Sequence, residues 1–170
     1  MTNAQTTAAE TLSAERLLCL GFAAPDDSAL LQQLSASRKI IAMPTSEAKY
    51  AVLAKSGEIG AALALAVSHA ESIEALVLLA PSKAEVDQTG DGLAEVKAQV
   101  LVLAGTRDAE GCEAATAFKR KRAASHLVYV YDAASDMDTE RPEAVAKVTL
   151  DFLTRRDKFL VSNADGRITR

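Results

Sequence analysis

Short apolar runs alternate along the chain with longer segments in which apolar residues recur every three or four positions. This alternation is typical of a parallel β-sheet that is covered by helices. We expect strands at the apolar runs 16–20, 39–43, 50–54, 75–80, 99–104 and 127–131. The run at 75–80 is apolar at all of its central positions, which favours a strand buried on both faces.

The segments between these runs show helical periodicity. A first helix is expected after Ser28, and further helices over 61–70, 110–122 and 142–156. Pro142 suits the first turn of the last helix, where its missing N–H costs nothing. The polar segment 82–92 contains two glycines and is expected to be a loop, followed by a short turn at 93–97.

Length and composition predict one domain. The chain has 170 residues, of which 49% are hydrophobic and 25% are charged, the usual balance of a soluble globular protein. A chain of this length buries enough surface to fold without metals or disulfides. We expect a flexible N-terminal segment over 1–14, a single domain over 15–156 and a tail over 157–170.

Composition also excludes several classes of partner. The net charge of −4 provides no domain-wide positive field for nucleic acid. No apolar run approaches the ~20 residues needed to cross a bilayer, and the N-terminus resembles no signal peptide, so we expect a cytoplasmic protein. Cys19 and Cys112 are too few for a disulfide framework and lack metal-ligand spacing, so no metal or cofactor is expected.

Four ordered segments resemble the α/β-hydrolase superfamily. Residues 56–81 resemble its nucleophile elbow with the following helix and strand, and Leu18-Cys-Leu-Gly-Phe22 resembles the start of its oxyanion loop. Residues 93–108 resemble the strand that delivers its acid, and 140–153 its last helix. The resemblance implies a three-layer α/β/α fold around a mostly parallel six-stranded sheet, truncated and without a cap domain.

The resemblance also places the candidate site residues. With Gly60 as the last glycine of the Gly-x-Ser-x-Gly elbow, Glu58 stands in the nucleophile place, Asp108 in the acid place and Ser135 in the histidine place. The backbone N–H groups of Phe22 and Ile59 take the places of the oxyanion donors. We expect the Glu58 carboxylate to lie near the helix N-terminus, where the helix dipole stabilises it, and to occupy or narrow the oxyanion hole.

Two main functions follow as hypotheses, beside a third in which the chain is a shortened subunit that completes a full-length hydrolase. With no histidine in the catalytic place, the first is a protein that has lost Ser-His-Asp hydrolase chemistry and binds a protein partner or a small ligand. The alternative is an active hydrolase, esterase-like or carboxylate-dependent through Glu58 and Asp108. Both residues also have plainer interpretations: Glu58 as a solvated side chain and Asp108 as a turn or cap.

The connection at 44–49 is short for this fold. Six extended residues span at most ~20 Å, whereas a parallel crossover normally contains a helix. Losing that helix uncovers apolar sheet surface, and such surface usually marks an association site. We therefore expect a homo-oligomer or a bound protein partner.

Overall fold

The computed structural model describes residues 16–22, 28–44, 48–159, 161–162 and 168–169. In these ranges a six-stranded sheet runs in the order β2-β1-β3-β4-β5-β6, and every neighbouring pair is parallel. Its strands are β1 (Arg16–Leu20), β2 (Lys39–Ile41), β3 (Tyr50–Lys55), β4 (Ile73–Leu79), β5 (Gln99–Gly105) and β6 (His126–Val130). The predicted parallel sheet is confirmed, strand by strand.

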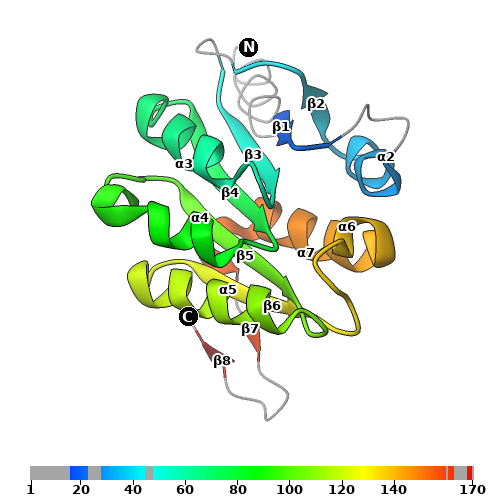
Figure 1. The fold of residues 1–170 in the computed structure, drawn as a ribbon. Helices are drawn as coiled ribbons and strands as arrows, with labels where there is room; N and C mark the ends of the chain where they lie inside the picture. The colour runs from blue at the N-terminus through cyan, green and yellow to red at the C-terminus, as the bar shows by residue number, and fades with distance from the viewer. Residues whose placement is uncertain (1–15, 23–27, 45–47, 160, 163–167, 170) are drawn as a thin grey trace, which may run out of the picture.

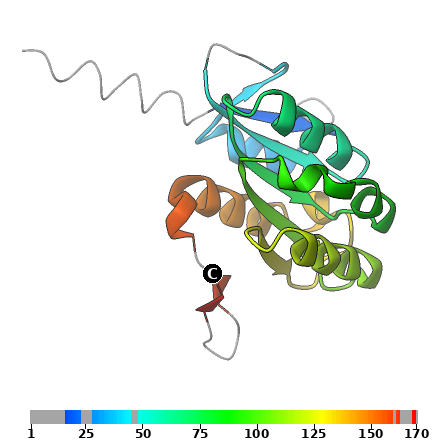
Figure 2. The same cartoon turned by 90° about the vertical axis from the view of Figure 1, so that its left-hand side faces the viewer.

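Helices cover both faces of the sheet (Figures 1 and 2). One layer contains α3 (Ile59–Ser68), α4 (Lys83–Gln88) and α5 (Ala109–Lys121), and the other contains α2 (Ala29–Ser35), α6 (Met137–Glu140) and α7 (Pro142–Arg155). Two buried clusters lie between the sheet and these layers, one on each face. The predicted three-layer α/β/α arrangement is therefore confirmed.

The alternation of side chains along β1 and β3 divides these clusters. Leu18 and Val52 face the α3 layer, whereas Leu17 and Leu53 face the α7 layer. All four side chains are buried, because each face of a doubly covered sheet packs against helices.

The predicted loop over 82–92 is wrong. Residues 83–88 form α4, and residues 90–94 form the 3-10 helix η2. The Ser82 hydroxyl accepts a hydrogen bond from the Glu85 N–H, and the Glu85 carboxylate accepts one from the Ser82 N–H. This Ser-x-x-Glu capping box begins the helix, and Val86, which is fully buried, anchors it to the core.

The second strand is shorter than predicted but lies where the fold class requires. It ends at Ile41 instead of residue 43, and it pairs in parallel with β1 at the edge of the sheet. The chain then passes β1 to enter β3, and no helix is found in the described parts of this connection, residues 42–44 and 48–49. Met43 is 75% exposed there.

Gly105 is required where β5 ends against the segment after β6. A Cβ at this position would collide with the backbone carbonyls of Ala133 and Ala134. Their close approach brings the chain back across the end of the sheet, and the Arg107 N–H donates to the Ala133 carbonyl at 2.9 Å.

The domain was predicted to end at residue 156, which is the first residue of η3 (Arg156–Lys158). Phe159, directly after η3, is buried. The Phe159 ring packs edge-on against His126 and Phe152, with ring centroids 5.2 and 5.3 Å away.

Strands β7 (Val161–Ser162) and β8 (Ile168–Thr169) form a separate antiparallel pair. The predicted N-terminal segment 1–14 lies outside the described residues. No helix in the described ranges is long and apolar enough to cross a bilayer.

Candidate functional site at the carboxyl edge of the sheet

All six strands are parallel, so their carboxyl ends meet at one edge, which we call the carboxyl edge. Ligands of open α/β sheets bind at this edge. Here β3 ends at Lys55, residues 56–58 turn the chain, and α3 begins at Ile59. Gly57 has a φ of +97°, a conformation that side-chain-bearing residues adopt only with strain. The sharp part of the turn is therefore at Gly57, whereas Glu58 has an ordinary φ of −116°.

The donors of this turn are occupied by Glu85 of α4. Its Oε1 accepts hydrogen bonds from the Gly57 N–H at 2.8 Å and from the Ile59 N–H at 3.1 Å. Its Oε2 accepts from the Ser56 hydroxyl at 3.2 Å and from the Ser82 hydroxyl at 2.8 Å. A carboxylate from another helix thus takes the position at the N-terminus of α3 that an external anion would otherwise take.

The hydrogen bonds keep this carboxylate ionised. Partial burial alone would raise the pKa of Glu85, but the hydrogen bonds from Ser82, Ile59 and Gly57 outweigh burial and lower it. Hydrogen bonds to the charged form of a carboxyl group favour that form. The negative charge is therefore a permanent part of the turn at neutral pH.

The expectation that Glu58 fills this position is wrong, because Glu85 holds the Ile59 N–H. Glu58 precedes the first residue of α3, and its side chain makes no capping hydrogen bond. Its stem passes close to Gly21, where an added Cβ would lie 3.0 Å from Glu58 Cγ. Glu58 is half-buried, and its stem lies on the β1 side of the turn.

Asp108 and Ser135 also reach the carboxyl edge. Asp108 precedes α5, and its Oδ1 accepts a hydrogen bond from the Gly111 N–H at 2.9 Å. This is the geometry of a helix N-cap. Ser135 is exposed in the segment between β6 and α6. Strand β4 lies between β3 and β5, the strands that precede Glu58 and Asp108, so these two strands are about 10 Å apart.

Neither histidine of the chain lies at this edge. His126 is the first residue of β6, and His69 ends α3 just before β4 begins. Both positions are at the amino ends of the parallel strands, on the opposite edge of the sheet. The pKa of His126 is lowered by burial and by the charge of Lys119, and its ring packs against Phe152 and Phe159.

A lysine and an aspartate connect the turn to the α6 layer. Lys55 Nζ lies 3.0 Å from Asp138 Oδ2, and Asp138 is almost fully buried. The same ammonium lies 5.4 Å from the centre of the Phe22 ring, close enough for a cation–π contact. Phe22 therefore meets the turn through its side chain, and Lys55 joins β1, β3 and α6.

The other side of the carboxyl edge carries an ion-pair network. Arg107 bridges Asp132 at 3.2 Å and Glu140 at 2.5 Å, and Arg141 bridges Asp132 at 2.7 Å. Glu140 also accepts a hydrogen bond from the Ala134 N–H at 2.8 Å. These charged groups bind one another, so they fix the segment between β6 and α7 in place. Among the described residues, no group of three or more His, Cys, Asp or Glu side chains is arranged to hold a metal ion.

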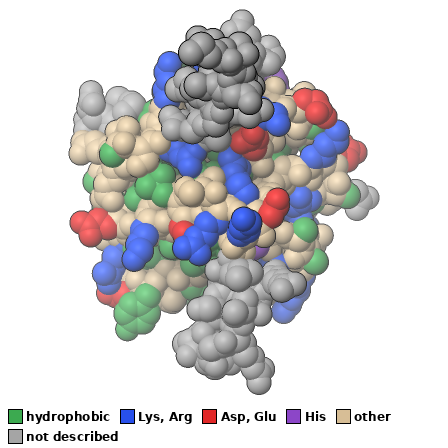
Figure 3. All heavy atoms as spheres, turned by 180° about the vertical axis from the view of Figure 1, so that it is seen from behind, with side chains coloured by type: hydrophobic (Ala, Val, Ile, Leu, Met, Phe, Trp, Pro, Cys, Tyr) green, Lys and Arg blue, Asp and Glu red, His purple; other side chains and the backbone are tan. Residues whose placement is uncertain are grey.

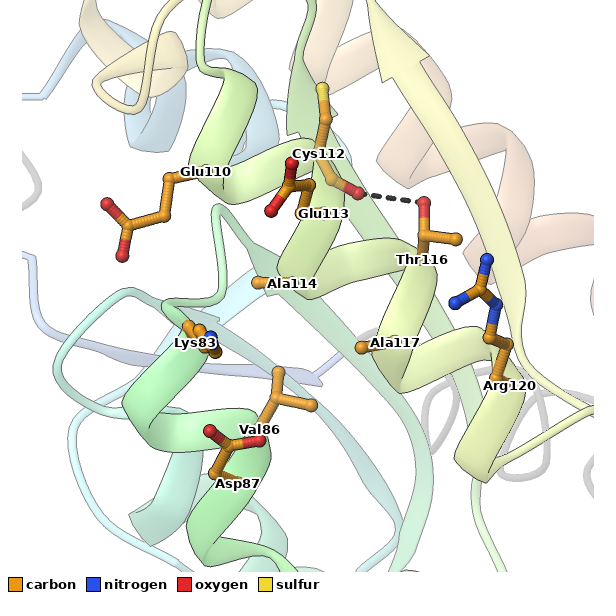
Figure 4. A pocket seen from close by; sticks show the side chains of 10 residues that line it. All are labelled: Lys83, Val86, Asp87, Glu110, Cys112, Glu113, Ala114, Thr116, Ala117 and Arg120. Atoms are coloured by element: carbon orange, nitrogen blue, oxygen red, sulfur yellow. Dashed lines mark hydrogen bonds between the residues drawn. The ribbon is translucent and has the colours of Figure 1, made fainter.

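A groove of about 420 Å³ lies between α4 and α5 (Figure 4). Its lining is of mixed charge, with Lys83 and Asp87 on α4 and Glu110, Glu113 and Arg120 on α5. The Cys112 thiol donates to the Gly105 carbonyl at 3.2 Å, and burial, followed by the charge of Asp108, raises the pKa of the thiol. This thiol is therefore a packing group, because its reactive anionic form is disfavoured.

Sequence reasoning missed Glu85, Ser56 and the Lys55–Asp138 pair. The capping-box spacing of Ser82 and Glu85 was the available signal for a helix there. Ser56 directly follows the apolar run of β3, which marks it as a residue of the turn. The pairing of Lys55 with Asp138 could not be predicted from a local sequence pattern, because the two residues are 83 positions apart.

Comparisons with known proteins bear on the fold. No family model matches the sequence, and no curated protein matches it. A serine hydrolase involved in carbazole degradation is similar with a TM-score of 0.67 at 17% identity, over 84% of this chain and 92% of that chain. A predicted CIB-like hydrolase from Thermoplasma acidophilum gives 0.65 at 14% identity, over 83% and 87%. Proline iminopeptidase from Mycobacterium smegmatis gives 0.62 at 12% identity, over 85% and 91%. At such identities the likeness establishes the fold alone.

Proposed function

We propose that this chain, which has the α/β-hydrolase fold, acts by binding a protein partner or a small ligand and does not hydrolyse it. The observation that carries the proposal is the position of Glu85. An oxyanion hole works by offering N–H donors to a charge that develops during the reaction. Glu85 already satisfies the Gly57 and Ile59 N–H groups with a full negative charge.

The proton-transfer groups support the same proposal. A nucleophile of this fold needs an imidazole within hydrogen-bond reach, held by an acid. Both histidines lie at the amino ends of strands, and the Asp108 carboxylate caps α5. At the carboxyl edge the Ile59 donor is thus occupied and neither histidine is present, which favours recognition over catalysis.

One contact favours the alternative, an active hydrolase. The Ser56 hydroxyl donates to Glu85 Oε2 at 3.2 Å, so the hydroxyl has a carboxylate beside it. A general base works best with a pKa near the operating pH, and the pKa of Glu85 is lowered from an already acidic value. Glu85 is consequently a weak base toward Ser56.

A fluorophosphonate probe and short-chain nitrophenyl esters test the proposal. We expect the wild-type protein to stay unlabelled and to hydrolyse the esters no faster than its Ser56→Ala and Glu58→Gln variants. The matched control is Ser37→Ala, which changes an exposed serine before β2. Labelling that disappears in Ser56→Ala, or turnover that falls at least tenfold (about 1.4 kcal/mol) in either site variant but not in the control, would establish a working hydrolase.

The edge of the sheet near β2 supports association with a second copy or another protein. Leu20 and Ile41 are only partly buried against the core of the α3 layer, and Met43 is exposed. We expect sedimentation velocity to give a species larger than the monomer. Replacing Met43 by Lys should shift the protein toward the monomer, whereas Lys97→Met, far from β2, should not. A wild-type monomer at micromolar concentration would contradict self-association.

A further inference from the structure

Strand β6 is the last strand of the six-stranded sheet, and no strand in the described ranges pairs with its outer side. Its five residues, His126–Val130, include no Lys, Arg, Asp, Glu, Pro or Gly. Proteins usually place such residues on an edge strand, because its free N–H and C=O groups pair readily with another chain. The strand at the other end of the sheet, β2, has three residues and begins with the exposed Lys39. Strands β7 and β8 form a separate sheet, so they do not extend β6.

One hydrogen bond shows which backbone groups of β6 point outward. The Val130 carbonyl accepts from the Thr106 N–H, directly after β5, at 3.0 Å, so the Val130 backbone faces β5. Successive residues of a strand direct their N–H and C=O groups to opposite sides. The backbone groups of Leu127 and Tyr129 therefore point away from the sheet, where a strand of another molecule can bind them.

The side chains beside this outer side are apolar or aromatic. Leu127 packs partly buried against the α5 face of the core, and Val128 packs partly buried against the α7 face. Tyr129 is 48% exposed, and Tyr131, just after the strand, is 83% exposed. Figure 3 shows a large hydrophobic side chain projecting from the lower end of the molecule, the end at which Figure 1 places β6. Exposed aromatic side chains of this kind are typical of protein interfaces.

Helix α5 lies beside β6 and has one charge of each sign on the same face. The Thr116 hydroxyl lies 3.1 Å from the Tyr129 hydroxyl, and Figure 4 shows Thr116 and Arg120 on the side of α5 next to β6. Glu113 and Arg120 stand one turn before and one turn after Thr116, a spacing that places residues on one helix face. Both charged side chains are exposed, and neither has an ion-pair partner in the described part of the chain.

We propose that β6 pairs in antiparallel orientation with β6 of a second copy of this chain, so that the two sheets join into one. Leu127 then lies opposite Tyr129 of the second copy, and each such pair exchanges both of its backbone hydrogen bonds. The two-fold axis passes through Val128, where the two valine side chains meet. Opposed aromatic and aliphatic side chains stabilise a strand pair, and a two-fold interface uses the same surface on both molecules.

The charges on α5 favour a second copy over an unrelated protein. Antiparallel pairing of β6 places the two α5 helices alongside each other in opposite directions. Thr116 contacts Tyr129, next to the axis, so the axis passes between Glu113 and Arg120. Each of these side chains then faces the opposite charge on the second copy. Complementary charges select a partner and fix its register.

Sedimentation velocity of the full chain tests this interface. The background is the Met43→Lys variant, which removes the exposed apolar side chain near β2, so the result does not depend on association at that end of the sheet. We expect a dimer at micromolar concentration. Adding Tyr129→Lys should weaken the dimer by about tenfold or more, because a lysine on an edge strand opposes pairing. Val67→Lys, which changes an exposed apolar residue of α3, is the matched control and should leave the dimer unchanged.

A charge exchange in the same background tests the orientation of the two copies. Glu113→Arg and Arg120→Glu should each weaken the dimer by about tenfold or more, because each places like charges opposite one another. A mixture of the two variants should associate again, since both opposite-charge pairs are restored in the heterodimer. The measurement is made at low ionic strength, because salt screens such pairs.

Three results would overturn the proposal: a folded monomer in the Met43→Lys background, a dimer undiminished by Tyr129→Lys, or no association in the mixture of charge variants. The first result would assign the outer side of β6 to a strand of another protein. Circular dichroism checks that each variant is folded, and the charge exchange decides the question if Tyr129→Lys is not. Ester hydrolysis by the wild type would contradict the proposed function and leave this interface standing.

Discussion

Glu85 accepts a hydrogen bond from the Gly57 N–H at 2.8 Å, and this contact joins α4 to the turn that ends β3. The acceptor lies 28 positions after the donor, on the far side of a helix and a strand. The carboxylate is also the reciprocal partner in the capping box of α4. One side chain therefore begins its own helix and stabilises the start of another.

Glu85→Gln is expected to lower the free energy of unfolding by about 1–3 kcal/mol, because a neutral amide cannot replace several charge-assisted hydrogen bonds. Urea denaturation measures the change. Asp87→Asn, the same type of substitution on an exposed residue of α4, is the control and should stay within about 0.5 kcal/mol. Equal effects of the two substitutions would mean that the contacts with Gly57 and Ile59 add nothing to stability.

The same contacts have a pH dependence. The pKa of Glu85 is lowered from 4.5 in the folded protein, so its stabilisation is complete above that value and is lost as the pH falls below it. The difference in unfolding free energy between wild type and Glu85→Gln should therefore shrink in acid. A difference that is constant from neutral pH to about pH 3 would contradict the lowered pKa.

Lys55→Met is expected to cost about 1–3 kcal/mol, because it leaves the buried Asp138 carboxylate without its cation. The matched control is Lys97→Met, whose pair with Glu71 has the same 2.9–3.0 Å geometry but is exposed, with side-chain exposures of 69% and 88%. The control should cost less than about 0.5 kcal/mol. Thermal unfolding of both variants measures the contrast, and a double-mutant cycle with Asp138→Asn isolates the pair.

Because the pKa of His126 is lowered in the folded protein, the free energy of unfolding should decrease as the pH is lowered below neutral. Burial and Lys119 lower its pKa from 6.5, so the unfolded chain takes up this proton at a higher pH than the folded protein does. Stability is therefore complete above about pH 6.5 and decreases as the pH falls through the folded pKa. His126→Phe keeps a ring beside Phe152 and should abolish this step in urea midpoints, whereas His69→Asn should preserve it.

Two glycines should respond in opposite ways to alanine. Gly105→Ala places a Cβ against backbone carbonyls and should cost about 1–3 kcal/mol or more. Gly60 lies inside α3, and a Cβ added there would have nothing within 4 Å, so Gly60→Ala should stabilise the protein by about 0.5–1 kcal/mol. A destabilising Gly60→Ala would show that position 60 needs a glycine, as the last glycine of an elbow does.

Sequence patterns predicted the sheet because its evidence is local. Buried strands such as 75–80 require unbroken apolar runs, and the last helix begins with a proline. The same approach failed at 82–92, where glycines and polar residues suggested a loop although the Ser82 and Glu85 spacing encoded a cap. A six-residue helix presents too few turns for periodicity to reveal it.

The candidate site was only partly predictable. Glu58, Asp108 and Ser135 do lie in segments that reach the carboxyl edge, since their places follow from the order of strands and turns. Which carboxylate meets the α3 donors depends on how α4 packs beside α3, and no spacing in the sequence reports that distance. The sequence also could not show which glycine forms the sharp part of the turn. Gly57 and Gly60 are both candidates, and only the backbone shows that Gly57 is the left-handed one.

Glu85 also affects how this chain can evolve. Because one carboxylate both supports the turn and fills its donors, a mutation that empties those donors simultaneously weakens the fold. Replacing Ser135 by histidine alone would leave the Gly57 and Ile59 N–H groups bonded to Glu85. Removing the Glu85 carboxylate first would lower the free energy of unfolding, which is small in most proteins. An empty pair of N–H donors at this turn would therefore require a compensating change elsewhere in the core.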